Sequence, residues 1–281
     1  MSGAINGVAH PALSPSAAPL AWTTQPTAAP LLQVTGLGHG YAGRAVLQGV
    51  QLQVQPGEFV ALLGASGAGK TTLLKCITGA LPPQQGSVQV AGVDLASTAP
   101  RDRRQASHQV AVVFQQFNLV RRLSALDNVL AGRLGHVPAW RGCLRQFSRA
   151  DRLLALQCLD RVGLLAQAGQ RADTLSGGQQ QRVAIARALA QQARLIVADE
   201  PVASLDPAIS ADILGLLQGI CRDDGVAVVC SLHQLHLARQ FAHRLVGLRD
   251  GQVVFDTTAA ALSAAQANAL YAPSTTPTPT P

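Results

Sequence analysis

The sequence predicts an α/β fold built on a largely parallel sheet. Three observations carry this prediction: short apolar runs alternate with helical patterns, a glycine-rich turn directly follows one of the runs, and two late runs flank Asp250-Gly251. Short apolar runs are typical of buried strands, and parallel strands need crossovers that are usually helical. The pattern therefore favours a sheet with helices on both of its faces.

The strands are expected in a definite order along the chain. An alternating segment at 50–54 and a turn at Pro56-Gly57 precede a short apolar strand at 58–63. Three further apolar runs, each short enough for a buried strand, follow at 110–114, 195–198 and 226–230. The last two runs, 245–248 and 252–255, flank Asp250-Gly251, which is a hairpin signal.

A long and mostly helical region is expected between the strands at 110–114 and 195–198. Apolar residues recur there at helical spacing, namely Leu153, Leu156, Leu159 and Val162, with Leu154, Cys158 and Leu165 widening the stripe. Such a stripe is typical of a helix that packs on a core. We interpret the region as a helical subdomain of about 116–175, inserted into a sheet domain that spans 31–271.

Both ends of the chain are predicted to be flexible. Residues 1–30 hold eight alanines, five prolines and no charged side chain, and residues 272–281 are rich in threonine and proline. The first segment lacks the positive start and the continuous apolar stretch of a secretory signal. Since no run of about 18 apolar residues occurs elsewhere, we do not expect the chain to cross a membrane by itself.

Composition excludes several classes of protein. The 281 residues are 48% hydrophobic and 13% charged with a net charge of +7, which excludes a disordered, charge-dominated chain. The positive excess comes from residues 101–152, which hold ten arginines and three aspartates. The five cysteines are widely spaced and odd in number, so we expect reduced, core-filling thiols rather than disulfides or a zinc site.

A phosphate-binding loop is the first functional motif. Residues 64–71 fit the pattern G-x-x-x-x-G-K-[ST] between an apolar strand and a stretch compatible with a helix. Glycines leave backbone N–H groups open to phosphate oxygens, and the following helix N-terminus favours an anion. Lys70 is expected to reach the terminal phosphates and Thr71 to ligate Mg²⁺. The predicted nucleotide-binding residues here are Gly64, Ala65, Ser66, Gly67, Ala68, Gly69, Lys70, Thr71 and Thr72.

Two carboxylates directly follow the apolar run at 195–198. In open parallel sheets, ligands bind at the carboxyl ends of the strands, so Asp199 and Glu200 are expected beside the phosphate loop. We expect Asp199 to hold the metal, directly or through water, and Glu200 to polarise the water that attacks the terminal phosphate. Alone, a strand that ends in acids is a weak signal, but paired with the phosphate loop it becomes a strong one.

A second anion-binding helix end is predicted at Leu-Ser-Gly-Gly-Gln, residues 175–179. Ser176 is a suitable N-cap, and Gly177 and Gly178 leave backbone N–H groups open ahead of a helix. One nucleotide does not need two such sites from one subunit. We infer that this one serves the nucleotide of a second copy, the alternative being an ordinary capped helix.

Together these motifs resemble the ATP-binding cassette (ABC) ATPases of membrane transporters, which are P-loop NTPases, over roughly residues 31–256. The segment 175–179 resembles the signature motif of that family, in which Ser176, Gly177, Gly178 and Gln179 contact nucleotide. The resemblance also implies antiparallel strands before the core sheet and an inserted helical subdomain. The fold is thus expected to combine a mostly parallel core sheet with both features.

The same resemblance implies roles for four residues outside these motifs. Tyr41 matches the aromatic residue that stacks on adenine, and Gln115 the glutamine that senses Mg²⁺ and the attacking water. Asp206 belongs to a loop that crosses the dimer interface, and His233 matches the histidine that contacts the γ-phosphate. Without the resemblance, the tyrosine would be a surface residue and the histidine a structural one. Gln116 is the weaker candidate beside Gln115.

The resemblance implies a transport ATPase that uses ATP and Mg²⁺ and closes as a head-to-tail dimer around two nucleotides. Its partners would be a second copy of the chain, an integral membrane permease and, through the permease, a substrate-binding protein. It would lie as a peripheral protein on the cytoplasmic face of the cell membrane. The arginine-rich stretch would face the permease, the anionic inner leaflet or only solvent.

The segment 114–141 and the motifs around Asp206 and His233 are similar to phosphonate-importer ATPases, so phosphonate is the expected cargo. The alternatives within transport are import of another small solute and export of a lipid or drug. A soluble cassette ATPase acting on nucleic acid is a different class, which the basic segment permits, but no nucleic-acid partner is expected because one cassette fills nearly the whole chain. A non-catalytic cassette is disfavoured because Lys70, Ser176, Glu200 and His233 are all present.

Overall fold

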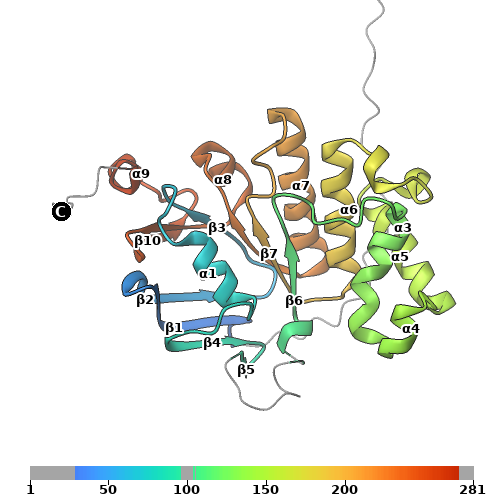
Figure 1. Cartoon of the computed structure of the whole chain (residues 1–281). Helices are drawn as coiled ribbons and strands as arrows, with labels where there is room; N and C mark the ends of the chain where they lie inside the picture. The colour runs from blue at the N-terminus through green and yellow to red at the C-terminus, as the bar shows by residue number, and fades with distance from the viewer. Residues whose placement is uncertain (1–28, 96–103, 105, 272–281) are drawn as a thin grey trace, which may run out of the picture.

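The computed structural model describes residues 29–95, 104 and 106–271, so residues 1–28 of the predicted extension and the whole predicted tail lie outside the described residues. Two sheets organise the described part (Figure 1). The strands are β1 (Leu32–Tyr41), β2 (Arg44–Val54), β3 (Phe59–Leu63), β4 (Gln85–Val90), β5 (Val93–Asp94), β6 (Val110–Val113), β7 (Leu195–Asp199), β8 (Ala227–Ser231), β9 (Arg244–Arg249) and β10 (Gln252–Thr258). No helix among the described residues combines the length and apolarity needed to cross a membrane.

Helices connect and cover these strands, and the short 3-10 helices are labelled η. They are α1 (Lys70–Ile77), α3 (Ala125–Leu130), η1 (Ala131–His136), α4 (Ala139–Cys143), α5 (Arg149–Arg161), η2 (Leu165–Gln167), η3 (Ala172–Thr174), α6 (Gly177–Ala190), α7 (Pro207–Asp224), α8 (Leu235–Phe241) and α9 (Ala264–Tyr271). The predicted α/β class is confirmed.

The larger sheet is mostly parallel, as predicted. Its strand order is β10-β9-β3-β8-β7-β6, and every neighbouring pair in it is parallel except β9 with β10. The runs predicted as strands at 110–114, 195–198 and 226–230 are β6, β7 and β8, with bounds that differ by one residue. The hairpin at Asp250-Gly251 is also confirmed. Because five parallel strands share a direction, their carboxyl ends meet at one edge of the sheet.

The two faces of the larger sheet are covered differently. Side chains alternate along β3, so Phe59, Ala61 and Leu63 join one buried cluster with α6, α7 and α8. Val60 and Leu62 join a second cluster with α1 and the smaller sheet. That sheet is antiparallel with the order β2-β1-β4-β5, which confirms the antiparallel strands predicted near the N-terminus. Helices thus lie on both faces, but a sheet covers much of the second face.

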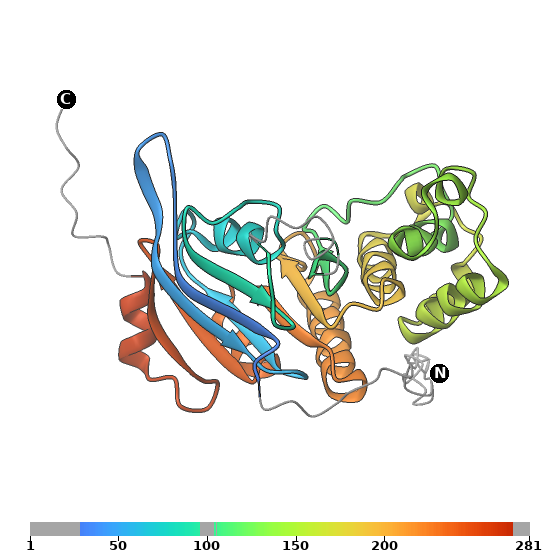
Figure 2. The same ribbon diagram turned by 90° about the horizontal axis from the view of Figure 1, so that it is seen from below.

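The described chain between β6 and α6 is helical and lies at the opposite end of the molecule from β10 and α9 (Figures 1 and 2). Its longest helix, α5, buries Ala155, Cys158 and Leu159. The predicted stripe was wrong for Leu153 and Leu165, which are 57% and 47% exposed. Leu153 lies away from the buried face of the helix, and α5 ends before Leu165, so the helical period no longer applies there.

Most of the cysteines fill the core, as predicted. Cys76, Cys158, Cys221 and Cys230 are buried, whereas Cys143 at the end of α4 is exposed, so the prediction was wrong for that residue. Burial raises the pKa of the Cys76 thiol to about 11. A buried thiol with a raised pKa stays protonated and unreactive at neutral pH, which is consistent with a packing role.

Candidate functional site

The loop between β3 and α1 is shaped by close backbone approaches. A Cβ atom at Gly64 would lie 2.3 Å from the carbonyl oxygen of Leu248, so only glycine fits there. Gly69 occupies the N-cap of α1 with a φ of 103° and offers no side chain to the helix. The first N–H groups of α1 have no partner within the helix. This helix end therefore presents donors and a positive dipole to an anion.

Lys70 lies inside this loop and is only 5% exposed. Its Nζ donates to the carbonyl oxygens of Gly64, at 2.8 Å, and Ala65, at 3.1 Å. Burial lowers the pKa of this amine, while the nearby carboxylates of Glu200 and Asp199 act in the opposite direction. The buried cation is thus held by main-chain oxygens at the centre of the loop, where a phosphate would meet it.

The carboxylates after β7 belong to a compact hydrogen-bond network. Ser231 Oγ donates to Asp199 Oδ1 at 2.8 Å and accepts the backbone N–H of Glu200 at 2.8 Å. Glu200 has a φ of 47°, which is uncommon for a residue with a side chain, and its Oε1 lies 2.5 Å from His233 Nε2. The serine therefore binds the Asp199 carboxylate and the backbone of Glu200. The histidine contacts the Glu200 carboxylate, which is expected to polarise water.

Ser231 is a residue that the sequence analysis missed. It ends β8, is fully buried, and is paired in register with Asp199 of the neighbouring strand. In the sequence it is one polar residue after an apolar run, 32 positions away from Asp199. The contact depends on β7 and β8 being neighbours, and this strand order is not visible from the run itself.

A cavity of about 270 Å³ brings several predicted residues together. Its lining includes Tyr41, Lys70, Thr71 and Glu200, from three separate parts of the fold. Val46, Ser66, Gly67, Gly69 and Thr72 complete the lining. Tyr41 is 47% exposed, so its ring is accessible to a planar base. Mg²⁺ prefers oxygen ligands. The Thr71 hydroxyl and the carboxylates of Glu200 and nearby Asp199 supply such oxygens. These residues fit a magnesium nucleotide.

Gln115 follows β6 at the same edge of the sheet as Asp199. Strands β6 and β7 are parallel, with Val113 paired to Ala198, so the residues after both strands leave the sheet on one side. Gln115 is exposed, and it is not among the described residues that line the Lys70 cavity. Its position suits a group that approaches the nucleotide from the edge of the site.

The second predicted helix end lies apart from the phosphate loop. Ser176 caps α6 by accepting the backbone N–H of Gln179, and Gln179 Oε1 accepts the N–H of Ser176 in return. A Cβ at Gly177 would lie 3.3 Å from Leu205, so this helix end borders the loop that leads to Asp206, the N-cap of α7. Among the described residues, neither Ser176 nor Asp206 lines the Lys70 cavity. Figure 1 shows α1 and α6 separated by the middle of the larger sheet.

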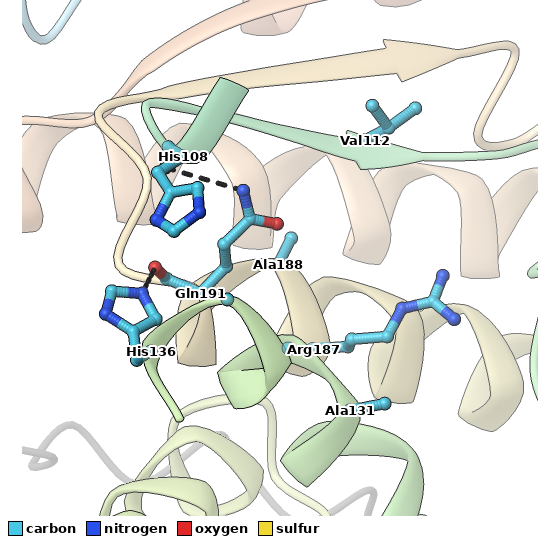
Figure 3. A pocket seen from close by; sticks show the side chains of 9 residues that line it. His108, Val112, Ala131, His136, Arg187, Ala188 and Gln191 are labelled. Carbon is cyan, nitrogen blue, oxygen red and sulfur yellow. Dashed lines mark hydrogen bonds between the residues drawn. The ribbon is translucent and has the colours of Figure 1, made fainter. Parts of the chain in front are cut away.

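Another cavity, of about 270 Å³, lies between η1, α6 and the start of β6 (Figure 3). His108 and His136 line it with ring centres 5.6 Å apart, and a ring nitrogen of His136 lies 2.9 Å from the carbonyl oxygen of Gln191. Gln191 Nε2 donates to the carbonyl oxygen of Val110. Because these polar groups join η1 and β6 to the C-terminal end of α6, the cavity marks a packed junction rather than a second nucleotide site.

Sequence comparisons identify similar proteins. A profile of the ABC transporter family matches residues 47–203. The hypophosphite import ATP-binding protein HtxD of Stutzerimonas stutzeri is 50% identical over 240 residues, which cover 85% of this chain and 70% of the relative. The phosphonates import ATP-binding protein PhnC 3 of Nostoc sp. strain PCC 7120 is 47% identical over 245 residues, which cover 86% of this chain and 92% of the relative.

Solved structures show the same fold. The dimeric post-hydrolysis structure of the ATP-binding cassette MJ0796 with ADP and Pi has a TM-score of 0.69 at 34% identity, covering 81% of this chain and 98% of that one. An inward-facing metal-chelate type ABC transporter, described as putative in its name, has a TM-score of 0.74 at 30% identity, covering 86% and 88%. The antiparallel sheet, the parallel core sheet and the helical region thus occur together in proteins of known structure.

Proposed function

The chain belongs to the ABC transporter family as the ATP-hydrolysing subunit of an importer, and from this premise we propose that it drives uptake of phosphonates through ATP-dependent dimer closure. The observation that carries the ATPase chemistry is the cavity that Lys70 and Glu200 share beside the Asp199–Ser231 contact. Cation, carboxylates and an open helix N-terminus meet there at the carboxyl edge of the sheet, the arrangement that phosphoryl transfer needs.

Each residue has a defined task in this proposal. The backbone of 64–69 and the Lys70 amine bind the phosphates, and Tyr41 stacks on the base. Glu200 accepts a proton from the attacking water, with His233 holding the carboxylate and contacting the γ-phosphate. Thr71, Asp199 and Gln115 would hold Mg²⁺, which neutralises charge that develops on the phosphates when it is bound. The phosphate-binding backbone is that of Gly64, Ala65, Ser66, Gly67, Ala68 and Gly69, and Thr72 is the remaining predicted contact.

A second copy completes the site. Neither Ser176 nor Asp206 is among the described residues that line the Lys70 cavity of their own chain, and the related cassette MJ0796 has a dimeric structure. We propose that Ser176, Gly177, Gly178 and Gln179 of one copy bind the nucleotide held by Lys70 of the other. Closure would then depend on the γ-phosphate, and hydrolysis would release it.

The cargo is proposed from relatives, because the substrate does not touch this subunit. PhnC proteins from several bacteria are 45–47% identical over most of the chain and are named phosphonate importers. The HtxD relative, at 50% identity, makes hypophosphite a second candidate. Both are oxyanions of reduced phosphorus, so the proposed cargo class is a small phosphorus oxyanion that carries a P–C or P–H bond.

The proposed setting is the cytoplasmic face of the membrane, where the chain would bind a permease and, through it, a substrate-binding protein. We propose that residues 31–271 form the ATPase domain and that about 116–175 form its helical subdomain, flanked by the extension 1–30 and the tail 272–281. Some of the arginines within 101–152 are proposed to face the permease or anionic lipid. Raising the salt concentration should then release the chain from vesicles, whereas attachment that does not depend on salt would contradict the electrostatic contact.

The cargo proposal is tested by reconstituting the full chain with candidate permeases in liposomes. ATP hydrolysis should rise when a phosphonate-loaded binding protein is added, with hypophosphite-loaded and phosphate-loaded binding proteins as matched comparisons. Stimulation by the hypophosphite form alone would replace the phosphonate assignment. Stimulation by neither reduced form, with basal hydrolysis intact, would overturn the cargo proposal and leave the ATPase chemistry standing.

A further inference from the structure

A half-buried arginine of α6 hydrogen-bonds the loop that follows Gln115. Arg187 donates from Nη1 to the carbonyl oxygen of Asn118 at 2.6 Å and from Nη2 to that of Phe117 at 3.1 Å. Arg187 lines the cavity between η1 and α6, but Figure 3 shows its side chain extending away from His108 and His136. The guanidinium therefore hydrogen-bonds two consecutive carbonyl groups just after Gln115, the residue proposed to sense the nucleotide.

The two residues that Arg187 hydrogen-bonds have an unusual backbone conformation. Phe117 and Asn118 have φ values of 57° and 51°, a region that residues with side chains rarely occupy. Two such residues in succession cost free energy and persist only where surrounding contacts impose them. The only cation that hydrogen-bonds both carbonyl groups within the described residues is Arg187. Together with the backbone hydrogen bonds of the turn, Arg187 thus holds the carbonyl groups of the loop just after Gln115.

Even partial burial of the arginine has an energetic cost. Burial lowers the pKa of its guanidinium, and no carboxylate of the described residues forms an ion pair with it. A partly buried cation is stabilised when it has hydrogen-bond acceptors, and here main-chain oxygens supply them. Its two donors match two adjacent carbonyl groups, which a lysine amine could not engage in the same planar geometry.

The position of Arg187 on α6 links this loop to the signature motif. The same helix begins at Gly177, and a Cβ at Gly177 would lie 3.8 Å from the ring of Phe117. A Cβ at Gly132 would lie 2.3 Å from the carbonyl oxygen of Arg187, so η1 packs tightly against α6 at the same level. A helix is stiff along its axis, so a displacement of α6 displaces the loop as well.

We propose that Arg187 is a positioning residue that couples the placement of Gln115 to the α6 helix bearing Ser176–Gly178. The inference rests on the proposed role of Gln115 in sensing the nucleotide. When α6 moves on dimer closure, the loop follows because Arg187 holds its carbonyl groups, and Gln115 reaches the nucleotide only in the closed state. Engagement by the partner copy thereby sets the catalytic geometry of this copy.

A double-mutant cycle on the full chain tests this coupling. Arg187→Ala and Gln115→Ala should each lower kcat by about ten- to a hundredfold with little change in ATP affinity, because the chemistry depends on sub-ångström placement. The double variant should be no slower than the worse single variant, since both act through the same loop. Arg187→Lys should recover part of kcat, and amide exchange at 116–119 should be faster in both Arg187 variants.

The matched control is Arg182→Ala. Arg182 lies on the same helix and donates to the carbonyl oxygen of Val162, outside the loop after Gln115. Its effect on kcat should be small and additive with Gln115→Ala. Normal kcat in Gln115→Ala would overturn the role of Gln115 and the coupling together. If Gln115→Ala lowers kcat but its effect is fully additive with that of Arg187→Ala, the role of Gln115 stands and the coupling is overturned. If Arg187→Ala fails to fold, Arg187→Lys serves instead, and unchanged amide exchange at 116–119 in that variant would overturn the coupling.

Discussion

The phosphate-loop site and the signature helix end are both proposed to bind an anion at a helix N-terminus, but they differ in how complete they are. Lys70 is buried, and its amine already has two carbonyl partners, while Ser231 and His233 hold the carboxylates. Ser176 is exposed, and its side chain is engaged only with its own helix. The first site is preorganised by folding of one chain, whereas the second becomes a binding site only when another molecule faces it.

Removing the proposed base tests the preorganised site and should have the largest effect. Glu200→Gln keeps the shape of the side chain but cannot accept a proton, so kcat should fall by about 10²- to 10⁴-fold. Binding of ATP should persist, because Lys70 and the loop backbone are unchanged. Near-normal hydrolysis, measured as phosphate release, would contradict the assignment of Glu200 as general base.

Removing the signature cap tests the incomplete site. Ser148 and Ser176 both cap helices through capping boxes, so alanine at either position should cost about 1 kcal/mol in unfolding free energy. Only Ser176→Ala should also lower kcat, by about ten- to a hundredfold, because it removes a contact to the nucleotide of the partner copy.

ATP affinity of the isolated copy should be the same in both cap variants, as measured by nucleotide titration below the dimerisation concentration. Equal losses of kcat in Ser148→Ala and Ser176→Ala would show that helix stability, rather than a nucleotide contact, explains the effect.

Ser231→Ala separates positioning from binding within the first site. Asp199 and the N–H of Glu200 would each lose a buried partner, so kcat should fall about tenfold while KM for ATP changes little. Ser231→Thr keeps the hydroxyl and should restore most of kcat, at some cost in packing. A rise in KM with unchanged kcat would instead assign the serine to substrate binding.

The smallest effect is expected in the helical region that supports the signature. Burial alone would raise the pKa of Asp151, but the hydrogen bonds from Ser148 and the ion pair with Arg133 outweigh it and hold that pKa below its ordinary value. The carboxylate therefore stabilises the fold above the unfolded-state pKa, and this stability is lost as pH falls through the lower folded-state pKa.

Asp151→Asn should lower the unfolding free energy by roughly 1–3 kcal/mol at pH 7. The difference in unfolding free energy between the variant and the unchanged chain should become smaller below about pH 4. Denaturant unfolding at several pH values measures both quantities. A difference that grows on acidification would show that the ion pair does not stabilise the native state. Hydrolysis per folded molecule should stay the same at pH 7.

Local sequence was enough to predict the elements of the core and the chemistry of the loop. A run such as 195–198 is wholly apolar because β7 is buried on both faces, and the glycines of 64–69 reflect close approaches such as that of Leu248 to Gly64. The helical spacing of apolar residues predicted burial less well in the helical region, where Leu153 is exposed. Which face of a helix is buried there depends on the neighbouring helices as well as on hydrophobicity.

By itself, the sequence determined which segments form the strands of the larger sheet, which loop is predicted to bind phosphate and which family of proteins the chain resembles, because these depend on residues adjacent in the chain. Only the tertiary structure decided that Ser231 holds Asp199 and Glu200 and that Arg187 grips the loop after Gln115. Those contacts join residues 31 to 70 positions apart. They arise from strand order and helix packing, which minimise the free energy of the whole chain rather than of any one segment.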